Sequence, residues 1–175
     1  MFTLFVSLLI LQRLAELALS RRNGRRLLAR GAVEAGRGHY PVMVAVHVAF
    51  YVCLVLEHRS WSPHWQLWLS LLLLAQLLRL WVLRTLGPLW TTRILVLPGS
   101  EPVRAGPYRF QRHPNYLAVV IEIFSIPMLA GAYWTAAIFS LLNALVLFVR
   151  IREEEKAMAR WMRWISPPRG TAARR

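Results

Sequence analysis

The sequence contains no aspartate, one lysine and one cysteine among its 175 residues. With Cys53 alone, the chain cannot form an internal disulfide, and the cysteine and histidine spacing typical of a zinc site is absent. The acids are eight glutamates, against 22 basic residues that are nearly all arginine. The resulting net charge of +14 would indicate nucleic-acid binding in a soluble protein. The first question is therefore whether the chain is soluble.

Long apolar runs are abundant, and they argue against a soluble chain. Hydrophobic residues make up 57% of the sequence, against about 45–50% in typical soluble domains. Several runs approach the roughly 20 apolar residues that a helix needs to cross a bilayer. We therefore expect an all-α integral membrane protein with about five transmembrane helices, and no nucleic-acid partner. The expected spans are residues 2–19, 41–57, 65–83, 116–130 and 134–150.

A single membrane domain over residues 1–165 is predicted, followed by a basic tail. The tail, residues 166–175, is rich in proline, glycine and arginine, which is typical of disorder. The first apolar run is followed by arginines and not by a small-residue cleavage site. It is therefore expected to remain as a helix and not to be removed as a signal peptide.

Basic residues are distributed unevenly between the connecting segments. Segments 20–40, 84–113 and 150–175 carry 6, 5 and 8 of them, whereas segment 58–64 carries one and segment 130–134 none. Cytoplasmic segments of membrane proteins are enriched in arginine and lysine. The distribution predicts an N-terminus outside and a C-terminus in the cytoplasm. The expected location is a bacterial inner membrane.

Besides Glu57 and Arg150, which are the last residues of their expected spans, four charged residues lie inside the spans, where charges usually pair or face the bundle interior. Arg13 and Glu16 are three residues apart on one helix face, which favours a structural ion pair over a catalytic one. Glu122 is either a functional carboxylate or the partner of Arg79 or Arg13, and the sequence leaves both interpretations open.

The longest polar segment, residues 84–113, is the first candidate for a functional loop. Its prolines and glycines exclude one continuous helix, and residues 91–97 are predicted to form a short strand-like piece. It ends in Gly106-Pro-Tyr-Arg-Phe-Gln-Arg-His-Pro-Asn-Tyr116, at the start of the fourth span. The helix of the fifth span is expected to continue into Arg150-Ile-Arg-Glu-Glu-Glu155.

The two polar constellations are expected to meet at one membrane depth, because the short turn near residue 131 makes the last two spans an antiparallel hairpin. An interfacial anchor explains the arginines and tyrosines but not the acids of residues 153–155, since acids at a helix C-terminus oppose the helix dipole. Polar groups that converge at a membrane face predict a cytoplasmic binding pocket.

Three motifs in this order, Gly106-Pro-Tyr108, Arg112-His-Pro-Asn-Tyr116 and Arg150-x-x-x-Glu154, resemble the isoprenylcysteine carboxyl methyltransferase family, including its shorter bacterial members. The resemblance covers residues 84–158. It implies transfer of a methyl group from S-adenosyl-L-methionine to the carboxylate or acidic hydroxyl of a lipid-like substrate at the cytoplasmic membrane face. Membrane lipids are the other expected partners, and no metal is expected.

The resemblance also implies which residues form the site. Arg150 is expected to bind the substrate, and Arg150 and Glu154 are the expected catalytic residues. Tyrosine rings and a carboxylate suit the cationic sulfonium and amino groups of the cofactor, and a guanidinium suits an oxyanion. The expected cofactor-binding residues are Ser100, Glu101, Pro102, Val103, Tyr108, His113, Pro114, Asn115, Tyr116 and Glu154.

The chain departs from the family pattern at several positions. Ser100 and Ala118 stand where the family often has histidine and glycine, and the Phe-Gly-x-x-Tyr segment of eukaryotic members is missing after Glu155. Residues 91–99 are more similar to bacterial relatives associated with polyketide-derived lipids such as alkylpyrones and alkylresorcinols. These differences favour an acceptor other than prenylcysteine.

Two other functions remain open from the sequence. An NADPH-dependent membrane reductase of the steroid-reductase type shares the Arg-His-Pro-Asn-Tyr motif, but should carry an acid near Ala118 or Val119, and the next acid here is Glu122. A phospholipid N-methyltransferase would keep the cofactor and change the acceptor. The identity of the acceptor and the oligomeric state do not follow from the sequence.

Overall fold

The computed structural model describes residues 1–165, most of which lie in five α-helices. The helices are α1 (Phe2–Ala29), α2 (Tyr40–Glu57), α3 (Trp65–Leu86), α4 (Pro114–Leu129) and α5 (Tyr133–Ile165). Three 3-10 turns, η1 (Arg37–His39), η2 (Gly87–Leu89) and η3 (Gly106–Arg109), and two strands, β1 (Val33–Ala35) and β2 (Ile94–Val96), lie between them. The predicted basic tail falls outside the described residues.

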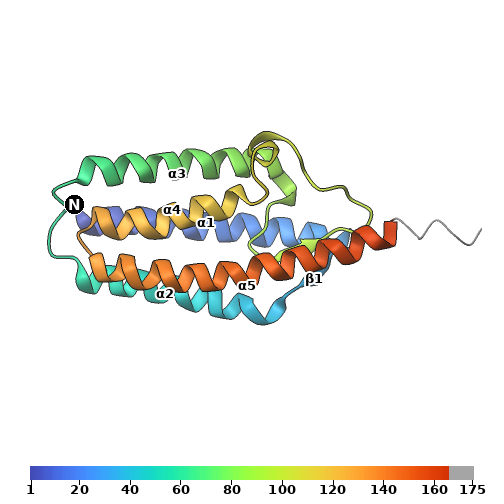
Figure 1. The fold of residues 1–175 in the computed structure, drawn as a ribbon, viewed down its shortest axis with the longest axis horizontal. Helices are drawn as coiled ribbons and strands as arrows, with labels where there is room; N and C mark the ends of the chain where they lie inside the picture. The colour runs from blue at the N-terminus through green and yellow to red at the C-terminus, as the bar shows by residue number, and fades with distance from the viewer. Residues whose placement is uncertain (166–175) are drawn as a thin grey trace, which may run out of the picture.

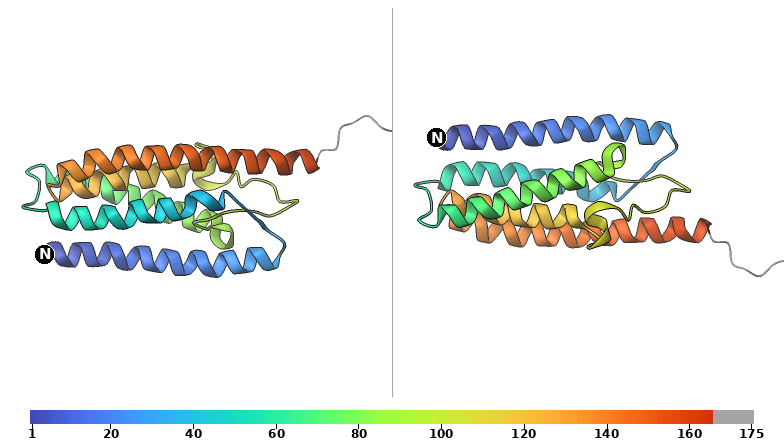
Figure 2. Two further views of the ribbon diagram at one scale, coloured as in Figure 1. Left: turned by 90° about the horizontal axis from the view of Figure 1, so that it is seen from below. Right: turned by 90° about the horizontal axis from the view of Figure 1, so that it is seen from above.

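The helices run along one common long axis (Figure 1). The N-terminus, the turn between α2 and α3 and the turn between α4 and α5 lie at one end of the bundle. The β strands, the long segment between α3 and α4 and the last turns of α5 lie at the other end, called here the loop end. In both views of Figure 2, α1 lies on the opposite side of the bundle from the α4–α5 hairpin.

Four of the helices, α1, α2, α3 and α5, are long and apolar enough to cross a membrane. This agrees with the predicted integral membrane protein. Helix α4 has 16 residues, which at about 1.5 Å per residue is shorter than the roughly 30 Å hydrocarbon core. Whether α4 is a fifth span therefore stays a prediction.

Helix α1 is longer than the sequence predicted. The first span was expected to cover residues 2–19, whereas the helix continues through Gly24 to Ala29. Arginine and leucine, which fill this part of the chain, are strong helix formers, and an added Cβ at Gly24 would lie 3.5 Å from the Leu95 side chain. Packing against the strand therefore outweighs the weak helix propensity of one glycine.

Helices α1 and α4 both end in a Schellman motif, in which a glycine adopts a left-handed conformation. Gly31 has φ 86° and Gly131 has φ 69°. At the end of α4, the Ala132 amide donates to the carbonyl of Pro127 over 2.8 Å. Helix α5 starts one residue later, and the short turn predicted between the last two spans is confirmed.

The first turn of α5 is capped by a residue from another helix. The Glu57 carboxylate, at the end of α2, accepts hydrogen bonds from the Trp134 and Thr135 amides at 2.8 and 2.7 Å. The Thr135 hydroxyl donates a third bond over 2.6 Å. Amides at a helix start have no partner within the helix, so Glu57 fixes α2 to the α4–α5 hairpin.

The two short strands pair in antiparallel fashion, with Val33 opposite Val96 and Ala35 opposite Ile94. The strand-like piece predicted within residues 91–97 is confirmed as β2. Its partner β1 was not predicted, because three residues carry no periodicity that identifies a strand. The pair joins the segment after α1 to the segment after α3.

The apolar core occupies the half of the bundle away from the loop end. It contains Val6, Leu9, Phe50, Leu54, Leu72, Ile123, Ile126, Leu129 and Phe139, together with Ala130 and Ala132. These residues come from the first halves of α1, α3 and α5, from the second halves of α2 and α4, and from the turn between α4 and α5. Smaller groups of buried apolar residues, among them Leu27, Val82 and Trp90, lie toward the loop end, where a cavity opens.

Candidate functional site

A cavity of about 1010 Å³ opens at the loop end of the bundle, a volume at the upper end of the range for small-molecule sites. Ten of the predicted site residues line it: Ser100, Glu101, Pro102, Val103, Tyr108, His113, Asn115, Tyr116, Arg150 and Glu154. Pro114 does not line the cavity. It is fully buried in the first turn of α4, where proline suits the helix start.

Gly106 sets the position of the loop that carries Tyr108. It has φ 55°, and an added Cβ would lie 2.3 Å from the Thr85 hydroxyl and 3.1 Å from the Trp81 indole nitrogen. Only glycine lets the chain approach α3 this closely in a left-handed conformation. The η3 turn then starts at this residue and brings Tyr108 to the cavity wall.

Tyr116 joins the two helices of the hairpin at the cavity. Its hydroxyl donates a hydrogen bond to Glu154 Oε2. Arg150 Nε donates to the same hydroxyl oxygen over 2.9 Å, and the guanidinium carbon lies 5.5 Å from the Tyr116 ring centroid. Arg150 and Glu154 are one turn apart on α5, so one tyrosine orients both.

His113 stacks on Tyr116, with the ring centroids 5.2 Å apart and the planes 13° from parallel. Its Nδ1 lies 3.9 Å from Glu154 Oε2, and its Nε2 lies 3.8 Å from Glu155 Oε1. Both separations exceed a normal hydrogen bond. The imidazole therefore adds to an aromatic wall beside two carboxylates without a hydrogen bond to either of them.

Two further groups at the cavity are suited to a polar ligand. The side-chain oxygen of Asn115 is buried, and no hydrogen-bond partner for it is found among the described residues. Burial, together with the nearby Glu154 carboxylate, raises the pKa of Tyr108 to about 12. Tyr108 therefore keeps its proton to a higher pH than an ordinary tyrosine. The Asn115 oxygen is an acceptor without a donor, which suits a ligand with amino groups.

Arg150 is 6% exposed, yet none of the carboxylates in the described part of the chain forms an ion pair with it. Its partners are the Tyr116 hydroxyl and the sulfur of Met43 in α2, which lies 3.3 Å from Nη1. A buried guanidinium without a counter-charge is costly. This cost predicts that an anion binds to Arg150 in the cavity.

The sequence did not identify a large part of the cavity wall. The end of α1 contributes Leu27, and the segment after α3 contributes Trp90 and Arg93. The strand-like pattern of residues 91–97 indicated that this segment is structured but not that it lines a cavity. Nothing in the sequence pointed to Leu27, because the first span was predicted to end at residue 19. The other lining residues without a predicted role are Leu86, Leu89, Thr91, Ile94, Leu95, Val96, Leu97, Arg104, Arg109, Arg112, Glu155 and Met158.

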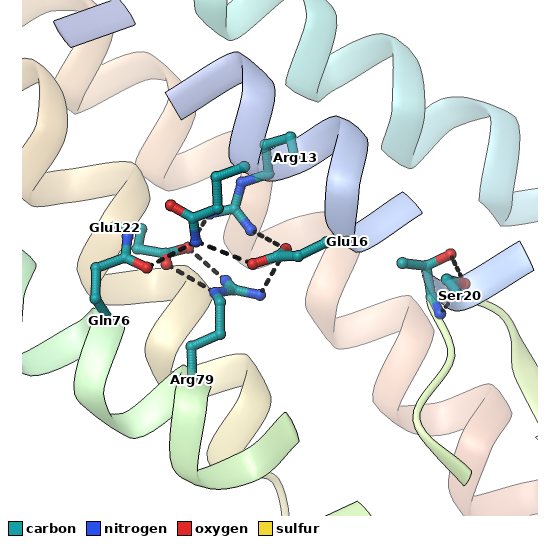
Figure 3. Close-up of polar contacts among 8 residues, drawn as sticks. Arg13, Glu16, Ser20, Gln76, Arg79 and Glu122 are labelled. Atoms are coloured by element: carbon teal, nitrogen blue, oxygen red, sulfur yellow. Dashed lines mark hydrogen bonds and ion pairs between the residues drawn. The ribbon is translucent and has the colours of Figure 1, made fainter. Parts of the chain in front are cut away.

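Glu122 does not line this cavity. It forms a buried cluster with both arginines that the sequence offered as partners, Arg13 of α1 and Arg79 of α3 (Figure 3). Arg79 Nε donates to Glu122 Oε1 over 2.8 Å. Glu16 completes the cluster, at 2.7 Å from Arg13 and 3.4 Å from Arg79. The two glutamates balance the two arginines, which is how charges are tolerated inside a membrane bundle.

Among residues 1–165, no three histidine, cysteine or glutamate side chains are grouped so that they could hold a metal ion.

Residues 68–160 match the family model described as the isoprenylcysteine carboxyl methyltransferase family. This segment contains all of the predicted site residues. The Bacillus subtilis protein YpbQ is 43% identical to the chain, over 90% of this chain and 96% of its own length. A Haemophilus influenzae protein is 31% identical, over 84% of this chain and 88% of its own length.

A more distant relative carries a functional name. The nickel-cobalt-cadmium resistance protein NccN of Alcaligenes xylosoxydans xylosoxydans is 29% identical, over 70% of this chain and 55% of its own length. No solved structure matches the chain significantly.

Proposed function

Since the chain belongs to the isoprenylcysteine carboxyl methyltransferase family, whose members are membrane methyltransferases, we propose that it transfers a methyl group from S-adenosylmethionine to an anionic lipid-like acceptor. The acceptor group is a carboxylate or an acidic hydroxyl, and the reaction takes place at the cytoplasmic face of the membrane.

The observation that carries this proposal is the contrast between two groups one turn apart on α5. Arg150 is a buried cation without a carboxylate partner among the described residues, and Glu154 is an anion whose side chain is 30% exposed. Both face one cavity and share the Tyr116 hydroxyl. A site with one cationic and one anionic position suits an anionic acceptor beside a cationic donor.

The residues present fit the donor. Glu154 supplies a carboxylate for a positively charged group, and the His113–Tyr116 stack supplies an aromatic face next to it. The unpartnered oxygen of Asn115 accepts a hydrogen bond from an amino group. Another part of the wall is formed by Ser100, Glu101, Pro102 and Val103.

The chemistry makes few demands on the protein. S-adenosylmethionine supplies a methyl group on a sulfonium; the carbon–sulfur bond breaks, the carbon–oxygen bond forms, and sulfur keeps the electron pair. An acceptor that is already ionised has no proton to lose, so no general base is required. Arg150 holds the acceptor oxygen in place, and Tyr116 keeps Arg150 and Glu154 at a fixed separation. Positioning of this kind is a large part of catalysis in such displacements.

The same geometry disfavours the two alternative functions. A phospholipid N-methyltransferase would bring an amine to the cavity, and the charge of Arg150 suits an anion better. For the reductase, the acid after the Arg-His-Pro-Asn-Tyr motif is Glu122, which is held by Arg13 and Arg79 and does not line the cavity.

The proposal is tested by incubating the purified protein with S-adenosylmethionine labelled on the methyl group and a lipid extract of bacterial membranes. We expect label to enter the lipid fraction with the native protein, and to enter it about 10- to 100-fold more slowly with Arg150→Ala. Release of volatile methanol by mild alkali identifies a methyl ester, and base-stable label identifies an ether. Label in a phospholipid amine would contradict the anionic acceptor, and no transfer to any lipid would contradict the proposal as a whole.

A further inference from the structure

Helix α1 lies outside the segment that matches the family model, which begins at residue 68. Its buried face is apolar at the start, with Val6 and Leu9, is polar in the middle, and is apolar again at Leu27. Glu16, Ser20 and Asn23 follow each other at intervals of four and three residues, so they lie on one face of the helix. A polar stripe on a membrane helix needs partners, because lipid offers none.

Asn23 forms hydrogen bonds to η2, the turn that leads into the cavity wall after α3. Its side chain is 1% exposed, and its amide group donates to the Gly87 carbonyl over 3.1 Å and to the Trp90 carbonyl over 2.9 Å. These carbonyls lie at the two ends of η2, which the Trp90 amide closes by donating to Gly87 over 3.2 Å. One side chain therefore fixes both ends of the turn, and Trp90 lines the cavity.

Ser20, one turn earlier, binds the next part of the same segment. Its hydroxyl oxygen accepts a hydrogen bond from the Thr92 amide over 2.9 Å and lies 2.8 Å from the Thr92 hydroxyl. Thr91 and Arg93, on either side, line the cavity. The wall from Leu89 to Arg93 is thus held against α1 by two side chains of α1.

The charged cluster fixes α1 itself. One turn before Ser20, Glu16 accepts from Arg13 and Arg79, and both arginines bind Glu122 of α4 (Figure 3). Buried polar contacts of this type hold membrane helices together, since lipid provides no hydrophobic drive between them. The cluster ties α1 to α3 and to α4, the helix that carries Tyr116.

We propose that Ser20 and Asn23 are positioning residues of the cavity: from α1 they hold the Gly87–Thr92 segment in the conformation that the cofactor requires. That the cavity receives S-adenosylmethionine rests on the proposed function. The holding of the segment by α1 does not depend on it, and the two statements are tested separately.

Four variants of the full-length protein in detergent test the proposal. Ser20→Ala removes the hydroxyl, and Ser20→Thr keeps it. Asn23→Asp keeps the shape of the side chain and removes both N–H donors. Ser70→Ala is the matched control, because Ser70 is an exposed serine of α3 that bonds only to the Gln66 carbonyl in its own helix.

Hydrogen–deuterium exchange of residues 87–97 is measured first. In Ser20→Ala and Asn23→Asp we expect exchange there to rise by about three- to tenfold, the factor for loss of one or two hydrogen bonds, with α4 and α5 unchanged. Ser20→Thr and Ser70→Ala should exchange like the native protein. Unchanged exchange in residues 87–97, or an equal rise over the whole chain, would overturn the proposal.

Affinity for S-adenosylmethionine is measured second, by calorimetric titration of the same variants. We expect weaker binding in Ser20→Ala and Asn23→Asp, with rescue in Ser20→Thr. If the native protein binds no S-adenosylmethionine, the proposed function fails while the exchange experiment still decides the role of α1. If exchange rises and affinity stays native, the segment is held by α1 but does not position the cofactor, and the proposal is wrong.

Discussion

At the scale of single residues, the site depends on three side chains that keep a positive and a negative charge apart. Tyr116 bonds to both Arg150 and Glu154, and these two do not form an ion pair with each other. A direct pair would neutralise both groups and leave the cavity without a preference for charge. With the hydroxyl between them, each keeps the capacity to bind a ligand of opposite sign.

Arg150→Ala should lower turnover by about 10- to 100-fold, the range expected when a hydrogen bond to a charged group is lost in the transition state. The affinity for S-adenosylmethionine should change little, because Arg150 is assigned to the acceptor. Arg152→Ala is the control, since Arg152 is exposed and lies over the Phe148 ring, 4.2 Å from its centroid. Steady-state kinetics at saturating cofactor measure the difference. A loss of cofactor affinity with normal turnover would show that the roles are reversed.

Glu122→Gln should destabilise the bundle, because Arg13 and Arg79 lose their shared counter-charge. Removing one partner of a buried pair costs about 3–5 kcal/mol in soluble proteins, and hydrogen bonds between membrane helices contribute roughly 0.6–2 kcal/mol. We expect a value between these ranges, measured as a lower unfolding temperature at a fixed heating rate. The double variant Glu122→Gln with Arg79→Gln should recover part of the loss. A double variant less stable than the single one would contradict the ion-pair account.

At the scale of elements, the end of the bundle away from the cavity is fixed by contacts between two short turns. The Ser62 amide donates to the Leu129 carbonyl over 3.1 Å, and His58 Nδ1 lies 2.7 Å from the Ala130 carbonyl oxygen. With Glu57 on the first turn of α5, these bonds fix the α4–α5 hairpin against α2 and α3. A rigid hairpin keeps Tyr116 and Glu154 in register at its other end.

Gly131→Ala should destabilise this hairpin by about 1–3 kcal/mol, because a residue with a side chain strains at φ 69°. The added Cβ would also lie 2.4 Å from the Ser60 carbonyl oxygen. Gly38→Ala is the matched control: an added Cβ there meets nothing within 4 Å, and its φ is not in the left-handed region. Thermal unfolding of the two variants measures the effect. Equal stability would mean that the turn relaxes without cost.

The sequence predicted the elements with strong periodic or motif signals and missed those that tertiary contacts create. The hairpin motifs led to Tyr108, Tyr116 and Glu154 because their residue types and spacing are specific. The last ten residues of α1 were missed, because four glycines between residues 20 and 40 suggested a break. No local pattern shows that Asn23 reaches the backbone 64 residues away, since such a contact depends on how whole helices pack.

At the scale of the whole molecule, the structure separates two sets of connections. Within residues 1–165, the arginine-rich segments lie at the loop end with the cavity, and the turns that are poor in basic residues lie at the other end (Figure 1). The proposed cofactor is soluble and would enter from the cytoplasm, so the cavity should open on the cytoplasmic side, where segments rich in arginine are also expected. This orientation in the membrane is a prediction, and the proposed function requires it.

Cysteine labelling tests this orientation. In a Cys53→Ala background, a cysteine that replaces Trp61 should react with an impermeant maleimide added to intact cells. One that replaces Arg104, at the cavity, should react only after the membrane is permeabilised. The two positions lie at opposite ends of the bundle, so each is the control of the other. The opposite pattern would place the N-terminus in the cytoplasm and the cavity outside.

The most direct test of the central claim is calorimetric titration of the purified protein in detergent with S-adenosylmethionine and, separately, with NADPH. We predict that S-adenosylmethionine alone binds, and that Glu154→Gln weakens it by about 10- to 100-fold, as expected when a charged hydrogen-bond acceptor is lost. Glu153→Gln should bind normally, because Glu153 bonds to Lys156 and does not line the cavity. Binding of NADPH without binding of S-adenosylmethionine would contradict the account and favour the reductase.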